Sequence, residues 1–179
     1  MLPRNHFFGG LVVCIILYFG FDVSWIGCFV FLVATVGIDV DHYLYYVYKK
    51  RDCNLRRAVG WFMKNGKILM KLDKKYRKEF YSGFCFLHGI EVLGLLVIFG
   101  FFIWDLFYFV ALGFLFHLIL DHIHQAFWRD RFDKFSIIYD YFKYGDLKFI
   151  EEIEGLEEMA SADLKKKLFG KSNGKRKSL

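Results

Sequence analysis

Four long runs of apolar residues dominate the first two thirds of the chain. They occupy residues 7–21, 23–38, 84–104 and 106–120, and the helical pattern of the last run can extend to Phe127. A helix that crosses a bilayer needs about 20 residues, so the first two runs reach a full span only if polar end residues such as His6, Asp39 and His42 lie at the interface. The pattern predicts an all-α, polytopic membrane helix bundle of about four transmembrane helices. A single long helix through Asp22, or a re-entrant hairpin, is the alternative for the first two runs.

The segments outside these runs predict four further features. In the loop of residues 49–80, apolar residues recur at helical spacing while Lys and Arg fill other positions; the apolar set is Leu55, Val59, Phe62, Leu69, Leu72 and Tyr76. This pattern is typical of an amphipathic helix lying in the membrane interface. The aromatic-rich residues 132–144 are expected to pack under the helix ends. We therefore expect a membrane-embedded bundle over residues 1–145, a charged cytoplasmic helix over 146–169 and a disordered basic tail over 170–179.

The distribution of positive charge predicts the orientation of the bundle. Of the 25 Lys and Arg residues, Arg4 precedes the first run, twelve lie between Lys49 and Lys78, and twelve follow Trp128. With four helices all of them fall on one side, which the positive-inside rule identifies as the cytoplasm. The sequence thus predicts a multi-pass protein of the inner, or cytoplasmic, membrane with both termini in the cytoplasm.

Composition supports a bilayer rather than a nucleic acid as the partner. The chain is 56% hydrophobic and carries a formal net charge of +6, and its basic residues flank apolar runs. The expected partners are the lipid bilayer and anionic lipid headgroups, and no nucleic acid is predicted. The four cysteines form no CxxC pair and are interpreted as small packing residues. No small-x-small cleavage site follows the first run, so we expect no signal-peptide removal.

The histidines and embedded carboxylates converge on one end of the predicted bundle. His6 opens the first span, and Asp39, Asp41 and His42 close the second; the others are His88 and Glu91 at the start of the third and His117, Asp121 and His124 at the end of the fourth. The spacings of three between His88 and Glu91 and four between His117 and Asp121 place each pair on one helix face. Bundle metal sites use such pairs, projecting inward from facing helices.

An ionisable residue within a span costs about 2.5–3.5 kcal/mol, and a bound divalent ion can offset several such costs. Ion pairs with Arg56, Arg57 or Arg129, or a proton path, are the alternatives to a metal. His122 adjoins Asp121 and faces away from His117, so we interpret it as a polar anchor.

At these residues the sequence resembles a known family, the YdjM-like inner-membrane metal-dependent hydrolases. The matching pieces are His6 in NHFFGG, the DVDH of residues 39–42, His88 in FLHGIE and the HLILD of residues 117–121. The family motif carries Pro before DxDH and Thr and Ser around the middle His, whereas this chain has Gly37-Ile38, Leu87 and Gly89. The family is distantly similar to zinc-dependent phospholipase C and P1-type nucleases. The resemblance therefore implies a phosphoester substrate, for which a lipid is one candidate.

Pattern and resemblance together predict a membrane-bound, metal-dependent hydrolase acting at the cytoplasmic face. The cofactor is a divalent metal, zinc first, and the candidate ligands are His6, Asp41, His42, His88, His117 and Asp121. Asp39 or Glu91 is expected to act as general base or to orient a ligand, and Arg56, Arg57 and Arg129 are candidates for binding the substrate phosphate. The alternatives are a non-enzymatic membrane adaptor and a metal or proton carrier; the outer half offers only Asp22 and Asp105 for such a carrier.

Overall fold

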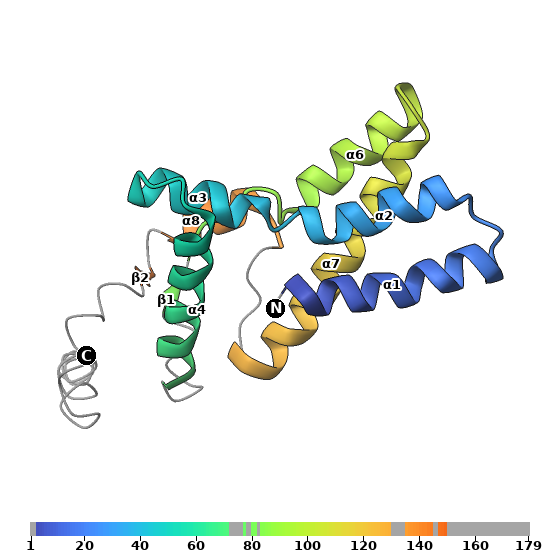
Figure 1. Cartoon of the computed structure of the whole chain (residues 1–179). Helices are drawn as coiled ribbons and strands as arrows, with labels where there is room; N and C mark the ends of the chain where they lie inside the picture. Colours follow the sequence, from blue (N-terminus) through green and yellow to red (C-terminus); the bar gives the residue numbers. More distant parts are fainter. Residues whose placement is uncertain are drawn as a thin grey trace, which may run out of the picture.

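A computed structural model describes residues 3–71, 77, 80–81, 83–129, 135–144 and 147–149 (Figure 1). Its helices are α1 (Pro3–Gly20), α2 (Trp25–Gly37), α3 (Val40–Lys50), α4 (Leu55–Lys71), α6 (Ile90–Phe102), α7 (Leu106–Arg129) and α8 (Ile137–Tyr144). Two short strands, β1 (Phe80–Tyr81) and β2 (Lys148–Phe149), pair in parallel with Phe80 opposite Lys148. The expectation of an all-α architecture is therefore confirmed, with this small strand pair as an addition.

The first two apolar runs form an antiparallel helical hairpin. Asp22 adopts a left-handed backbone conformation with φ of 55°, which ends the helical path that starts at Pro3. Ser24 then caps α2, because its Oγ accepts a hydrogen bond from Gly27 N at 3.2 Å. The alternative of one continuous helix through Asp22 is thereby excluded, and α1 and α2 lie side by side (Figure 1).

Close packing of α7 against α2 forms the centre of the bundle. A Cβ atom at Gly113 of α7 would lie only 2.6 Å from the carbonyl oxygen of Phe31, so only glycine allows this approach. Around this crossing lies the apolar core, which consists of Cys14, Cys28 and Phe31 packed against Phe109, Phe116 and neighbouring aliphatic residues. Cys14 and Cys28 are thus packing residues, as expected. The short distance between α2 and α7 also brings Thr35 and His117 together, which matters for the site described below.

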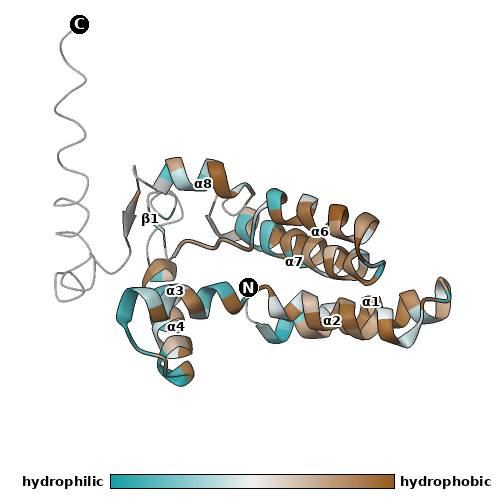
Figure 2. Cartoon of the chain, turned by 90° about the horizontal axis from the view of Figure 1, so that it is seen from above, coloured by the Kyte–Doolittle hydropathy of each residue, from teal (hydrophilic) through white to brown (hydrophobic). Residues whose placement is uncertain are grey.

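Within the residues that the structure describes, two helical stretches are long and apolar enough to cross a membrane. They are Trp25–Lys50, which includes α2 and α3, and Leu106–Phe127 in α7; α6 is apolar but shorter. Figure 2 shows hydrophobic residues along α1, α2, α6 and α7, while hydrophilic residues gather on α3 and α4. This arrangement is compatible with membrane association.

The third apolar run differs from the prediction at its start. Helix α6 begins at Ile90, and the preceding residue, Gly89, has extended backbone angles of φ −122° and ψ 149°. Residues 83–89 form turns and irregular chain. The expectation that His88 and Glu91 share one helix face is therefore wrong, because His88 lies in the turn before the helix.

The C-terminal part is described only in pieces. Residues 137–144 form α8, which packs at the start of α6: Ile90 N donates a hydrogen bond to Phe135 O at 2.9 Å. Lys148–Phe149 forms β2 rather than part of the expected helix, because its backbone pairs with β1. The rest of the helix expected over 146–169, the tail over 170–179, and Leu72 and Tyr76 of the expected interfacial helix lie outside the described residues.

The turn between α3 and α4 is organised by its own hydrogen bonds. Arg51 ends α3 in the left-handed conformation with φ of 54°. The Asp52 carboxylate then accepts hydrogen bonds from Asn54 N at 3.0 Å and Tyr46 Oη at 2.8 Å. The Asn54 amide, with the Tyr46 hydroxyl, lowers the pKa of Asp52 below its usual value. These contacts fix the direction in which α4 leaves α3.

Candidate metal centre

Buried histidines and carboxylates from four separate segments meet at one place in the fold. His6 comes from the start of α1, Asp39 and Asp41 from the junction of α2 and α3, His88 from the turn before α6, and His117 and Asp121 from α7. His6, Asp41, His88 and His117 are at most 1% exposed and Asp121 is 3% exposed. The convergence of these residues, which the sequence predicted from topology, is present in the structure.

The centre of this group is a pair of histidine nitrogens. His88 Nε2 and His117 Nε2 lie 3.2 Å apart. The other nitrogen of each ring is already engaged: His88 Nδ1 donates to Asp41 Oδ2 at 2.8 Å, and His117 Nδ1 donates to Thr35 O at 2.8 Å. A neutral imidazole with its proton on Nδ1 has a lone pair on Nε2. Two lone pairs therefore face each other, and a cation or an additional proton must lie between them.

Two carboxylates lie near these nitrogens, and each belongs to its own group of possible ligands: Asp39 with His88 and His117, and Asp121 with His6 and His117. Asp39 Oδ1 lies 3.6 Å from His117 Nε2 and 3.7 Å from His88 Nε2. Asp121 Oδ2 lies 3.8 Å and 4.0 Å from the same two nitrogens. Two ligands about 2.05 Å from one tetrahedral zinc ion are roughly 3.3 Å apart. The separations of 3.2–3.7 Å among His88 Nε2, His117 Nε2 and Asp39 Oδ1 are close to that value or slightly larger, as expected for donors that surround a shared ion.

His6 closes one side of the cluster. Its ring stacks on His117, with ring centroids 3.8 Å apart and an interplanar angle of 11°, and its Nε2 lies 3.3 Å from Asp121 Oδ1. Neither nitrogen of His6 makes a hydrogen bond within the part of the chain that the structure describes. A fully buried imidazole without a hydrogen bond is costly, so His6 is available to a ligand that lies beside Asp121.

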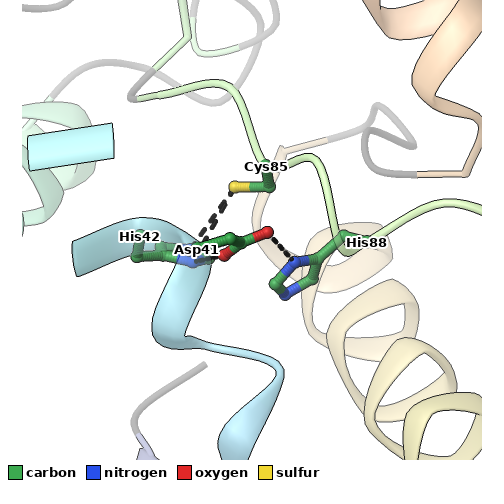
Figure 3. Close-up of side chains that lie close together, drawn as sticks. All are labelled: Asp41, His42, Cys85 and His88. Atoms are coloured by element: carbon green, nitrogen blue, oxygen red, sulfur yellow. Dashed lines mark hydrogen bonds and ion pairs between the residues drawn. The ribbon is translucent and has the colours of Figure 1, made fainter. Parts of the chain in front are cut away.

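Asp41 holds two histidine rings at once (Figure 3). One oxygen accepts from His88 Nδ1 and from Leu87 N at 3.0 Å, and the other accepts from His42 Nδ1 at 2.7 Å. Separations of 2.7–2.8 Å are ordinary hydrogen-bond lengths and too short for two ligands of one tetrahedral zinc. Asp41, which was predicted as a ligand, thus lies behind His88 and orients its ring. Asp39, which was predicted as a general base or an orienting residue, faces the two Nε2 atoms instead.

Cys85 lies close to the ring of His42 (Figure 3). Its Sγ is 3.6 Å from Nε2 and 3.8 Å from Nδ1 of that ring. Because the sulfur is nearly equidistant from both nitrogens, it faces the ring between them and is not aligned with either lone pair. A further group of possible metal ligands consists of Asp41, His42, Cys85 and His88. Because Asp41 is hydrogen-bonded to both histidines of this group at 2.7–2.8 Å, the group around the two Nε2 atoms is the better candidate.

Local backbone structure explains how the centre is positioned. At the end of α2 the helix tightens, with Asp39 N bonded to Val36 O at 3.3 Å. The carbonyl of Thr35, one of the orphan groups of a helix end, instead accepts a hydrogen bond from His117 Nδ1. The Leu87 amide fixes the turn of residues 83–89 to α3 through Asp41. Helix ends and the turn before α6 therefore supply His6, Asp39, Asp41 and His88, whereas one face of α7 supplies His117 and Asp121.

Several predicted site residues lie elsewhere. Glu91 accepts hydrogen bonds from Ser136 Oγ and from Ile137 N at 3.0 Å, so its carboxylate caps the start of α8. Arg56 and Arg57 are exposed on α4, and Arg57 Nη1 lies 3.5 Å from Asp52. The backbone of Arg129 ends α7, and its side chain lies outside the described part of the structure. His42 lies at the edge of the cluster with a side chain that is 25% exposed.

His122 and His124 complete the set of histidines. His122 Nδ1 donates to Leu118 O within α7 at 2.6 Å, which is a local contact in keeping with its interpretation as an anchor. His124 is half-buried one turn beyond Asp121.

Three contributors to the site were missed by sequence reasoning: the Thr35 carbonyl, the Leu87 amide and the Cys85 thiol. The first two are backbone groups, whose role does not depend on residue type, and no pattern in the sequence marks them. Cys85 lies three residues before His88, which is a signal that could have raised it as a candidate.

Comparisons with known proteins give no assignment. The chain matches no protein-family model, no curated protein and no solved structure. The resemblance to the YdjM-like hydrolases therefore stays a prediction carried by the four short motifs.

Proposed function

We propose that the protein is a membrane-bound, metal-dependent hydrolase that acts on a phosphoester at the cytoplasmic face of the membrane. The observation that carries the proposal is the approach of His88 Nε2 and His117 Nε2 to 3.2 Å while both Nδ1 atoms are engaged as donors. A metal ion between them satisfies both lone pairs at once. Asp39 and Asp121 each supply negative charge within 4.0 Å of both nitrogens.

The donor set fits a divalent ion of borderline softness. Imidazole nitrogens and carboxylate oxygens suit zinc first, and manganese or iron can use the same ligands. His88, His117 and Asp39 would hold one ion, and His117, Asp121 and His6 offer a second group of possible ligands beside it. A divalent ion there supplies Lewis acidity, which polarises a phosphoryl oxygen and makes water a better nucleophile near neutral pH.

The remaining residues of the cluster have positioning and proton-handling roles in this proposal. Asp41 fixes the tautomer and direction of His88, as carboxylates behind metal-bound histidines commonly do. It holds His42 in the same way. Because His42 is partly exposed, it is the imidazole best placed to exchange protons between water and a bound substrate.

The membrane placement is part of the proposal. Trp25–Lys50 and Leu106–Phe127 provide two apolar stretches of sufficient length, and α1 and α6 would complete four spans. All Lys and Arg residues then lie at the end that holds the cluster. The metal centre would lie at the level of the cytoplasmic headgroups, where phosphoesters are abundant.

Hydrolysis of a chromogenic phosphodiester by the purified protein in detergent tests this proposal. We expect metal-dependent turnover that falls at least 100-fold in His117→Ala and Asp121→Asn, and that survives in His122→Gln, a control on the same helix. Equal activity in all four proteins, or none before and after zinc, manganese or iron is added, would contradict hydrolysis. Metal-dependent proton or metal flux into liposomes without hydrolysis would instead favour a carrier.

A further inference from the structure

Helix α4 presents three separate faces rather than the two of a simple amphipathic helix. One face is buried in the protein and consists of Ala58, Asn65, Ile68 and Leu69. The apolar residues that the sequence assigned to a single face are divided by the structure: Leu69 is buried, whereas Leu55 and Val59 are exposed.

The second face is an exposed apolar stripe. Leu55, Val59, Met63 and Met70 follow one another at spacings of four and seven residues, and each is between 41% and 63% exposed. Spacings of four and seven return to the same side of a helix. Gly66 lies on this stripe too, and a Cβ at that position would meet nothing within 4 Å. The stripe is therefore continuous along the helix and is not covered by the described part of the chain.

The third face is basic. Arg56, Lys64, Lys67 and Lys71 are all exposed and follow helical spacing on the side next to the apolar stripe. Arg57 is also exposed and lies near Asp52. A helix with adjacent apolar and basic exposed stripes is typical of one that binds an anionic lipid surface, with its apolar residues at the boundary of the acyl chains.

We propose that the exposed apolar and basic stripes of α4 dock on a bilayer surface that contains anionic phospholipid. Figure 1 shows α4 running across the direction of α1 and α2, as a helix lying in the membrane plane would. The charge complementarity of the basic stripe selects anionic lipid over a neutral surface. The inference rests on the membrane placement of the proposed function but is independent of the metal.

The docked helix contacts the edge of the candidate metal centre. The Phe62 ring, on α4, packs against the ring of His42 with centroids 5.2 Å apart, and the turn between α3 and α4 is fixed by the bond from Tyr43 Oη to Cys53 O at 2.7 Å. The lipid surface bound by α4 is therefore adjacent to the partly exposed edge of the cluster. This arrangement favours a substrate presented by the lipid surface, namely a phospholipid headgroup.

The test uses the full chain in vesicles of phosphatidylcholine with or without phosphatidylglycerol. A fluorescent label is placed at Val59→Cys on the apolar stripe or at Lys64→Cys on the basic stripe, each in a Cys53→Ser background. We expect a lipid-borne bromine quencher to reduce emission at position 59 at least threefold more than at position 64, and omission of phosphatidylglycerol to weaken that quenching. Met63→Cys serves as a second apolar site if Val59→Cys does not fold.

Equal quenching at positions 59 and 64, or quenching at 59 that does not depend on phosphatidylglycerol, would overturn the inference. Protection of position 59 from aqueous iodide without quenching by bromolipid would point to a protein partner instead, and would also overturn it. Metal content is measured on the same samples, so that a metal-free protein with a lipid-quenched label would contradict the proposed hydrolase and leave the lipid surface intact.

Discussion

His117 Nδ1 donates a hydrogen bond to the carbonyl of Thr35 at 2.8 Å, across the crossing of α7 and α2. This bond determines which nitrogen of His117 is free, and it directs Nε2 toward His88. The chemistry of the cluster thus depends on how closely two apolar helices pack. Gly113, next to Phe31 and Thr35, makes that packing possible.

Substitution of Gly113 should therefore damage both the fold and the site. In Gly113→Ala the new Cβ would lie 2.6 Å from Phe31 O, which is backbone and cannot move aside. We expect a loss of about 1–3 kcal/mol in the free energy of unfolding and weaker metal binding, measured by denaturation in detergent and by metal retention.

The control for this prediction is Gly94→Ala in α6, where a Cβ would meet nothing within 4 Å. Alanine there should stabilise the helix by roughly 0.5–1 kcal/mol, because glycine is unfavourable in helix interiors. If Gly113→Ala were as stable as Gly94→Ala, the described packing of α7 against α2 would be wrong.

Removing the Asp41 carboxylate charge should weaken metal binding without removing a ligand. Asp41→Asn keeps the size of the side chain but can no longer accept from His88, His42 and the Leu87 amide together. Loss of such a carboxylate typically costs 10–100-fold in metal affinity, which competition with a chelator would measure. Asp52→Asn, in the turn after α3, is the control and should keep full affinity; equal affinities in the two variants would argue against the orienting role of Asp41.

Glu91 offers a test that separates a structural carboxylate from a catalytic one. Because its oxygens accept from Ser136 Oγ and Ile137 N, Glu91→Ala should release the start of α8 and leave metal content unchanged. Hydrogen exchange of residues 137–144 should rise at least tenfold, while exchange in α7 should not change. Loss of metal in Glu91→Ala with α8 still protected would show that this carboxylate belongs to the site.

The site was only partly predictable from the sequence. The placement of His6, His88 and His117 at one end of the bundle could be predicted, because the apolar runs and the charges between them determine the end at which each residue lies. The DVDH segment could not be resolved in the same way: it lies where α2 ends and α3 begins, so ideal helical spacing does not say whether Asp39 or Asp41 faces His88 Nε2. Glu91 was misassigned for a related reason, since the helix that was expected to pair it with His88 begins only at Ile90.

The fold, too, was predictable in part. The apolar runs predicted the helices of the bundle, and Asp22 correctly marked a possible break between the first two. The sequence could not assign the faces of α4, because a periodic apolar residue such as Val59 or Leu69 gives the same pattern whether a protein segment or lipid covers it. Tertiary contacts decide that question, and they divide the two residues between an exposed and a buried face.

The most direct test of the account is the metal content of the full-length protein, purified in mild detergent without chelators and measured by elemental mass spectrometry. We expect at least one equivalent of a divalent metal per chain, zinc first, reduced below about a tenth in the double variant His88→Ala/His117→Ala and retained in His122→Gln. A folded wild-type protein that contains no metal and takes up none when zinc, manganese or iron is added would contradict the central claim that His88 and His117 share an ion.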